Sequence, residues 1–172
     1  IAYCPERVLP GKIMKELVEN DRIVGGLTVT STKKVVEFYR LFVNGDILET
    51  DAKTAEMCKL AENSFRDLNI AFANEISIIC EKYSIDPFEL ISLANKHPRL
   101  NILKPGCGVG GHCIAIDPWF IASQSPEFTT LIQAGREVNL NKTNWSINLI
   151  INKIQELKIK LKRKHLIAVC LL

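Results

Sequence analysis

Residues 51–83 read DAKTAEMCKLAENSFRDLNIAFANEISIICEKY, which is the longest stretch of the chain without a helix breaker. The stretch holds no Gly or Pro and is rich in Ala, Glu, Lys and Leu, which favour helices. We predict one long helix of about eight or nine turns, at ~3.6 residues per turn. Because apolar side chains lie on its faces, this helix is expected to form the spine of a helical domain.

Further helix signals follow this stretch. Asp86 suits an N-cap, Pro87 the first helical position and Glu89 the reciprocal capping-box position. This pattern predicts a second helix that ends near His97-Pro98. Residues 98–116 contain two prolines and four glycines and are not expected to be helical.

The C-terminal third predicts two more helices and a strand. Asp117-Pro118 is a second N-cap and first-turn pair, so a short helix through Ser123 is expected. Ser125-Pro126-Glu127 is expected to cap a long helix that runs towards Lys164. Residues 166–172 are continuously apolar after a basic segment, which is typical of the first buried strand of another domain.

The N-terminal part, residues 1–50, is predicted to be mixed α/β. Arg22 to Gly26 resembles a short strand that ends in a glycine turn. A helix is expected from Ser31 or Thr32 to Asn44-Gly45, and a short extended piece follows it. The predicted fold class is therefore mainly α, with long helices preceded by a small α/β piece.

Composition limits the class of protein. The 172 residues are 47% hydrophobic and 24% charged, as in ordinary globular proteins and unlike disordered or collagen-like chains. A net charge of +3, and a basic run at 158–165 without interleaved aromatic residues, give no support for nucleic-acid binding. Because no apolar run approaches ~20 residues, we expect no membrane span.

Cysteine usage indicates the compartment. The six cysteines are scattered and no pair is spaced C-x-x-C, so we expect reduced thiols in a cytoplasmic protein. The chain opens with Ile1-Ala2-Tyr3-Cys4-Pro5-Glu6 and not with a basic and then apolar segment, so no secretory signal is expected. The chain begins with Ile1 rather than Met, and its last apolar run has no partner strand after it. We therefore interpret the sequence as a piece of a longer protein.

A glycine-dense loop ends in a cysteine. Gly106, Gly108 and Gly111 match G-x-G-x-x-G, but a dinucleotide fingerprint needs a strand before it and a helix directly after it. What remains is a loop that lets backbone approach a ligand and presents Cys113, with His112 beside it. From composition alone Cys113 is either a catalytic thiol or an inert small residue. Adjacent Cys and His ligands would strain a tetrahedral centre, so no metal is predicted.

Four other polar residues are candidate site residues only when they are considered together. Lys59 and Asn63 are four apart on the long helix and therefore share a face. Taken singly, they and Glu6 are equally compatible with solvated side chains, and Asp117 with a helix cap.

Five motifs occur in a recognisable order: Cys4-Pro5-Glu6-Arg7-Val8-Leu9-Pro10-Gly11, Asn20-Asp21-Arg22-Ile23-Val24-Gly25-Gly26, Ala55-Glu56-Met57-Cys58-Lys59-Leu60-Ala61-Glu62-Asn63, His97-Pro98-Arg99 and Gly108-Val109-Gly110-Gly111-His112-Cys113. Together they resemble the UDP-glucose/GDP-mannose dehydrogenase family over essentially the whole chain. That family oxidises the C6 alcohol of a nucleotide sugar to a carboxylate with two NAD molecules.

The resemblance assigns catalytic roles. Cys113 matches the nucleophile that forms a thiohemiacetal and then a thioester. Lys59 and Asn63 match residues that stabilise the oxygen at C6. Asp117 matches a carboxylate that positions or activates water, and Glu6 a proposed base in thioester hydrolysis.

The resemblance also implies how the sugar is bound. Arg99 is similar to an arginine that reaches a neighbouring subunit's substrate, and Gly110, Gly111 and His112 are the expected substrate-binding loop. His112 stands where glucose-type members carry Ser, which favours a UDP-sugar of the N-acetylmannosamine type. Cys107 replaces an expected Pro. Gly135 interrupts a helix where Ala would be usual, at a cost of about 1 kcal/mol.

By resemblance, residues 1–50 are the end of an NAD-binding domain and residues 51–165 a central dimerisation and catalytic domain. Residues 166–172 would begin a UDP-binding domain. We expect NAD as cofactor, with its contact residues unassigned, a UDP-sugar substrate and a homodimer, and no turnover from this piece alone. Two alternatives remain: a non-catalytic oligomerisation module or remnant, and a cysteine hydrolase that pairs Cys113 with His97 or His112.

Overall fold

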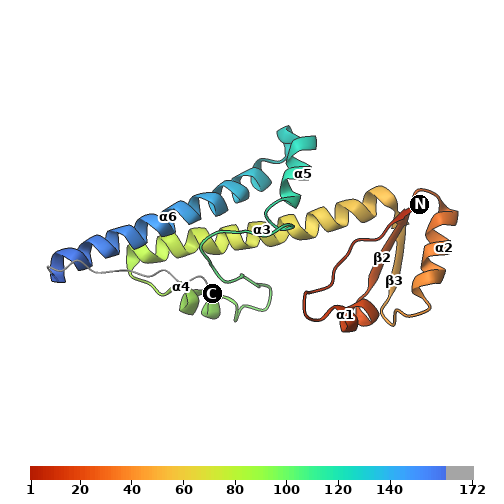
Figure 1. Cartoon of the computed structure of the whole chain (residues 1–172), viewed down its shortest axis with the longest axis horizontal. Coiled ribbons are helices and arrows are strands. Elements are labelled where there is room, and N and C mark those ends of the chain that lie inside the picture. Colours follow the sequence, from red (N-terminus) through yellow and green to blue (C-terminus); the bar gives the residue numbers. More distant parts are fainter. Residues whose placement is uncertain (162–172) are drawn as a thin grey trace. The chain divides into compact units, whose positions relative to one another are not determined.

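The computed structural model describes residues 1–161 as six α-helices, one 3₁₀ helix and a three-stranded sheet (Figure 1). They form two compact units, the first made of Ile1–Arg66 with Ile116–Phe128 and the second of Asp67–Ala115 with the chain from Thr129 onward. The prediction of a mainly helical fold after a small α/β piece is confirmed.

The first unit contains the sheet, in the order β1 (Ala2–Tyr3), β2 (Arg22–Gly26) and β3 (Ile47–Asp51). β2 pairs antiparallel with β1 and parallel with β3, and it has the bounds that the sequence predicted. Gly25 is required in β2 by close packing, because a Cβ there would overlap the Asp51 carbonyl and lie 2.5 Å from the Ala55 Cβ.

Two helices accompany the sheet, α1 (Ile13–Glu19) and α2 (Val29–Tyr39). The predicted start of α2 at Ser31 or Thr32 is wrong, because Thr28 is its N-cap and Ser31 completes a capping box with it. The predicted end at Asn44-Gly45 is also too late. α1 was not predicted; it is short and has no side-chain N-cap.

The first unit also holds α5 (Asp117–Gln124) and the 3₁₀ helix η1 (Pro126–Phe128). The predicted N-cap role of Asp117 is wrong: Ile116 is the N-cap and makes no side-chain cap bond. Asp117 is the first helical residue, so its carboxylate is not used as a cap. The predicted cap at Ser125 is also displaced, since η1 comes before the next long helix.

The second unit combines the C-terminal part of α3 (Ala52–Tyr83) with α4 (Pro87–Ala94) and α6 (Thr130–Leu161). The long helix predicted over 51–83 is confirmed. Asp86 caps α4, accepting hydrogen bonds from the N–H groups of Phe88 and Glu89, although α4 ends earlier than predicted. The strand predicted at 166–172 lies outside the described residues.

The contact between α3 and α6 is unusually polar. Six of its buried side chains are hydrophilic: Asp67, Asn74, Ser77, Arg136, Asn139 and Lys142. Gly135 lets α6 approach α3 closely, because a Cβ there would lie 2.5 Å from Leu68 Cδ2. Gly135, for which the sequence indicated only a cost to helix formation, therefore has a packing role.

None of the helices in the described part of the chain has the length and apolar character to cross a membrane.

Candidate active site

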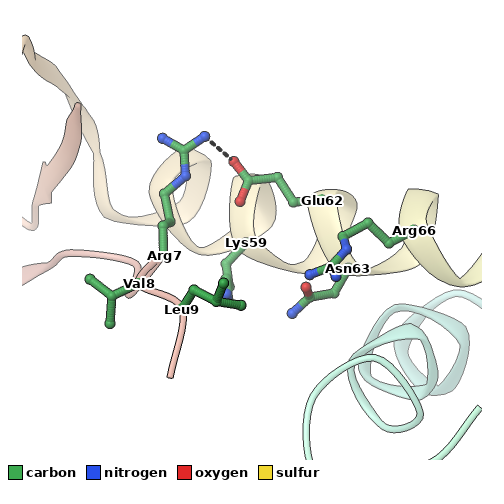
Figure 2. Close-up of a pocket in the computed structure, with 7 residues that line it drawn as sticks. All are labelled: Arg7, Val8, Leu9, Lys59, Glu62, Asn63 and Arg66. Atoms are coloured by element: carbon green, nitrogen blue, oxygen red, sulfur yellow. Dashed lines mark ion pairs between the residues drawn. The ribbon is translucent and has the colours of Figure 1, made fainter. Parts of the chain in front are cut away.

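Lys59 and Asn63 lie on one face of α3, as their spacing predicted. They line a hollow of about 210 Å³ in the first unit. Figure 2 shows Arg7, Val8 and Leu9, from the loop after β1, on the other side of this hollow. Its lining is completed by Glu62 and Arg66, one turn along the same helical face.

The loop after β1 is held to α3 by Lys59. The Lys59 ammonium donates a 2.7 Å hydrogen bond to the main-chain carbonyl oxygen of Glu6. A second tie is the 2.7 Å ion pair between Arg7 and Glu62, whose side chains are half-buried. These contacts place the Glu6 segment beside the face of α3 that carries Lys59 and Asn63.

The Glu6 carboxylate has its own partners. Its Oε1 atom accepts hydrogen bonds from the N–H groups of Arg7 (2.7 Å) and Val8 (3.0 Å), and the Arg22 guanidinium lies 3.4 Å away. Desolvation is the largest single influence and raises the pKa of Glu6, but these donors together outweigh it and lower the pKa. Glu6 is therefore a carboxylate at neutral pH.

Asn63 and Asp117 form a second contact in the first unit. The buried Asn63 amide donates a 2.6 Å hydrogen bond to Oδ2 of Asp117. This bond uses one oxygen of the carboxylate and leaves the other able to accept a hydrogen bond from water. Four predicted site residues, Glu6, Lys59, Asn63 and Asp117, thus belong to one unit and are joined in pairs.

The remaining predicted residues belong to the second unit. Cys113 and His112 are exposed at the end of the glycine-dense loop. Arg99 is also exposed, and its guanidinium lies 3.3 Å from Nε2 of His97. A Cβ at Gly110 or Gly111 would meet no atom within 4 Å, so these glycines border open space. The loop can therefore admit a ligand close to its backbone.

The described residues do not form an NAD cradle by themselves. A pyrophosphate needs free backbone N–H groups at a β–α turn. At the turn between β2 and α2, the Thr28 and Ser31 side chains already cap the helix, and a Cβ at Gly26 would overlap the Thr32 hydroxyl. We therefore assign no NAD contact in this part of the chain.

Two parts of this chain match models of one protein family. The profile described as UDP-glucose/GDP-mannose dehydrogenase family, central domain, matches residues 53–141. The profile of the same family's NAD binding domain matches residues 1–43. The chain belongs to the UDP-glucose/GDP-mannose dehydrogenase family.

Named relatives of this family member are closely similar in sequence. UDP-N-acetyl-D-mannosamine dehydrogenase of Campylobacter jejuni is 59% identical over 157 residues, which are 91% of this chain and 39% of that protein. NDP-N-acetyl-D-galactosaminuronic acid dehydrogenase of Ralstonia nicotianae is 57% identical over 150 residues, 87% of this chain and 36% of the relative. The chain thus spans less than two fifths of either relative.

A solved structure shares the fold. The UDP-D-ManNAc dehydrogenase from Pyrococcus horikoshii superposes with a TM-score of 0.88 at 44% identity, covering 91% of this chain and 38% of that chain.

Sequence reasoning missed two parts of the site in this dehydrogenase family member. The sequence motif that contains Arg7 does not indicate a role for it. Glu62 and Arg66, however, continue the polar spacing of Lys59 and Asn63 and indicate a wider polar face. The hydrogen bond between Asn63 and Asp117 was not predicted, because the Asp117 carboxylate was expected to cap a helix. In the described residues, no group of three or more His, Cys, Asp or Glu side chains could hold a metal ion.

Proposed function

We propose that this chain is the catalytic core of an NAD-dependent nucleotide-sugar 6-dehydrogenase that converts UDP-N-acetyl-D-mannosamine to its uronate. The observation that carries the proposal is the grouping of Glu6, Lys59, Asn63 and Asp117 in one unit of a chain 59% identical to an enzyme of that name. Residues 1–50 would complete an NAD-binding domain and residues 51–165 form the central domain. Residues 166–172 would begin a UDP-binding domain.

The chemistry assigned to Cys113 proceeds in two oxidations. The first takes a hydride from C6 and a proton from its oxygen, leaving an aldehyde. The Cys113 thiol then adds to the aldehyde carbon to form a thiohemiacetal. Loss of a second hydride and a proton gives a thioester. Water adds to this thioester, the carbon–sulfur bond breaks, and a carboxylate and the free thiol are released. NAD accepts hydride in the overall reaction.

Each remaining side chain suits one part of this sequence. The Lys59 ammonium can stabilise negative charge on the C6 oxygen, and Asn63 can donate to the same region. Asp117, held by Asn63, has a second carboxylate oxygen with which to orient the hydrolytic water. Glu6, ionised at neutral pH, can accept a proton from that water. Arg99, Gly110, Gly111 and His112 are assigned to the sugar nucleotide.

The proposal extends to assembly and location. On α6, apolar side chains between 45% and 54% exposed form a stretch suited to association between two copies: Leu140, Ile147, Ile150 and Ile151. We propose a cytoplasmic homodimer that supplies uronates for polysaccharide synthesis.

A second candidate substrate is the galactosamine isomer, because the Ralstonia relative named for N-acetyl-D-galactosaminuronic acid is 57% identical. The two sugars differ in configuration, so parallel assays with UDP-N-acetyl-D-mannosamine and UDP-N-acetyl-D-galactosamine separate them.

The test is a chimera in which this chain replaces the aligned segment of the Campylobacter jejuni enzyme. We expect two NADH per UDP-N-acetyl-D-mannosamine consumed, and no turnover after Cys113→Ser. Cys107→Ser is the matched control, because Cys107 is an exposed thiol of the same loop and should be dispensable for chemistry. A folded chimera without NADH formation would favour a non-catalytic helical module. Ester hydrolysis without NAD would favour a cysteine hydrolase.

A further inference from the structure

A chain of buried polar side chains runs from α6 through α3 in the second unit. It begins at the ion pair of Arg136 and Asp67, which are 3% and 1% exposed and 2.6 Å apart. The Asn139 amide donates hydrogen bonds to Asp67 at both Oδ1 (2.8 Å) and the main-chain oxygen (3.1 Å). Asn139 is 1% exposed, so its amide has no bulk water with which to exchange these bonds.

Asn74 continues the chain to the glycine loop. Its amide nitrogen donates to Oδ1 of Asn139 at 2.8 Å, and its own Oδ1 accepts from the N–H of Gly106 at 2.8 Å. The carboxylate of Asp67 requires a donor from Asn139, and this orients the oxygen of Asn139 towards the donor of Asn74. If either amide were flipped, a donor would face a donor or an acceptor would face an acceptor. In a buried site the lost hydrogen bonds would be costly. The buried ion pair therefore fixes the direction in which Asn74 offers its oxygen to the loop.

The segment before the loop is held in the same way. Asn69 bonds to Asn101 and Leu103, and Asn95 bonds to both main-chain groups of Ile102. This part of the chain is neither helix nor strand, so side-chain amides satisfy its backbone.

Thr143 adds a second anchor, on α6. Its hydroxyl donates a 2.8 Å hydrogen bond to the carbonyl oxygen of Cys107. The next residue, Gly108, has φ +133°, and a Cβ there would overlap the Thr143 hydroxyl and lie 3.0 Å from the Asn139 carbonyl oxygen. The backbone at 106–108 is thus pressed against α6.

The rest of the loop is built differently. A Cβ at Gly110 or Gly111 would meet no atom within 4 Å, and the Cys113 side chain that follows them is exposed. The loop is therefore fixed where it starts and open where the thiol lies, with four residues between Gly108 and Cys113.

We propose that Asn74 and Thr143 are positioning residues for Cys113. They hold the start of the loop so that the thiol meets the C6 aldehyde in the geometry required for addition. The inference rests on the proposed catalytic role of Cys113. Misplacement of a reacting atom by about 1 Å can reduce a rate by about 10²-fold, so a loosened anchor should lower kcat more than it weakens substrate binding.

The decisive variants are Thr143→Val and Thr143→Ser. Thr143 is exposed, so valine removes the hydroxyl without opening a cavity in the core, and serine restores it. Asn74→Ala is a stronger change, but Asn74 is fully buried and that variant can fail to fold.

Two readouts are measured. In the 172-residue chain, hydrogen exchange of the amides at 106–113 should accelerate about fivefold in Thr143→Val and stay unchanged in Thr143→Ser, with the melting temperature within about 2 °C. In the chimera, Thr143→Val should lower kcat about tenfold with KM for the sugar nucleotide changed less than about twofold, and Thr143→Ser should retain kcat.

The outcomes separate the two proposals. If Cys113→Ser is inactive but Thr143→Val keeps its kcat, the positioning inference is overturned and the proposed function stands. If Cys113→Ser remains active, the proposed function fails and the positioning role fails with it. Faster exchange with an unchanged kcat would show an anchor that does not serve catalysis, and would also overturn the inference.

Discussion

Glu6 is held at two places, at its carboxylate and at its main-chain carbonyl. The carbonyl accepts from Lys59, while the carboxylate faces Arg22 and the backbone N–H groups of Arg7 and Val8. A substitution of the carboxylate therefore leaves the Lys59 contact in place.

Glu6→Gln should remove a pH-dependent contribution to stability. Because the folded-state pKa of Glu6 is lowered, its contribution is fully present above the unfolded pKa of about 4.3 and is lost as pH falls through the folded pKa. The side chain is 59% exposed, so solvent screening limits the effect to about 0.5 kcal/mol or less. Urea unfolding should show wild type more stable than the variant at pH 7, with the difference shrinking as the pH falls below about 4. A difference that grew in acid would contradict the assignment.

The helices α3 and α6 are joined by a buried ion pair between Asp67 and Arg136. Asp67 Oδ2 and Arg136 Nε are buried without a hydrogen-bond partner among the described residues, so the pair is joined by a single contact. Removing one partner leaves a buried charge uncompensated.

Asp67→Asn should lower the free energy of unfolding by about 3–5 kcal/mol, because Arg136 would remain charged and buried. Glu156→Gln is the matched control on α6, since its pair with Lys153 is exposed and should be worth less than about 1 kcal/mol. Chemical denaturation of both variants measures the contrast. Equal losses would mean that burial does not set the strength of the α3–α6 pair.

Local signals predicted some elements well and others poorly. α3 could be predicted because 32 residues without a breaker carry a helical pattern, and the α4 cap because Asp86 and Pro87 act on adjacent backbone. The start of α5 could not be predicted, since Asp before Pro fits either the N-cap or the first helical position. In the structure Asp117 is the first helical residue, and its carboxylate accepts a hydrogen bond from Asn63.

The candidate site divides in the same way. Lys59 and Asn63 could be placed on one face from their spacing. The partners of the buried polar side chains could not be predicted. Asp67 and Arg136, for example, are 69 residues apart, and no periodic pattern in the sequence links them. The family resemblance assigned roles to single residues. The contacts that hold those residues in place could be seen only in the structure.

The exposed apolar side chains of α6 favour the proposed homodimer. Ile147→Glu should convert a homodimer to a monomer, because it places a charge in the exposed apolar stretch of α6. Asn144→Glu adds the same charge at an exposed polar position of this helix and should leave the mass unchanged. Multi-angle light scattering of the 172-residue chain gives the masses. A monomeric parent, or a variant that stays dimeric, would contradict association through this face.

In the proposed reaction, Cys113 carries the substrate as a thioester that Asp117 helps to hydrolyse. Asp117→Asn keeps an acceptor for Asn63 but loses the negative charge that orients water, so the acyl intermediate should accumulate. The most direct measurement is the mass of this variant of the chimera after incubation with UDP-N-acetyl-D-mannosamine and NAD. We expect a nucleotide-uronyl adduct on Cys113 that hydroxylamine releases and that is absent from Cys113→Ser. NADH formation without an adduct on Cys113, or an adduct on Cys107 instead, would contradict it.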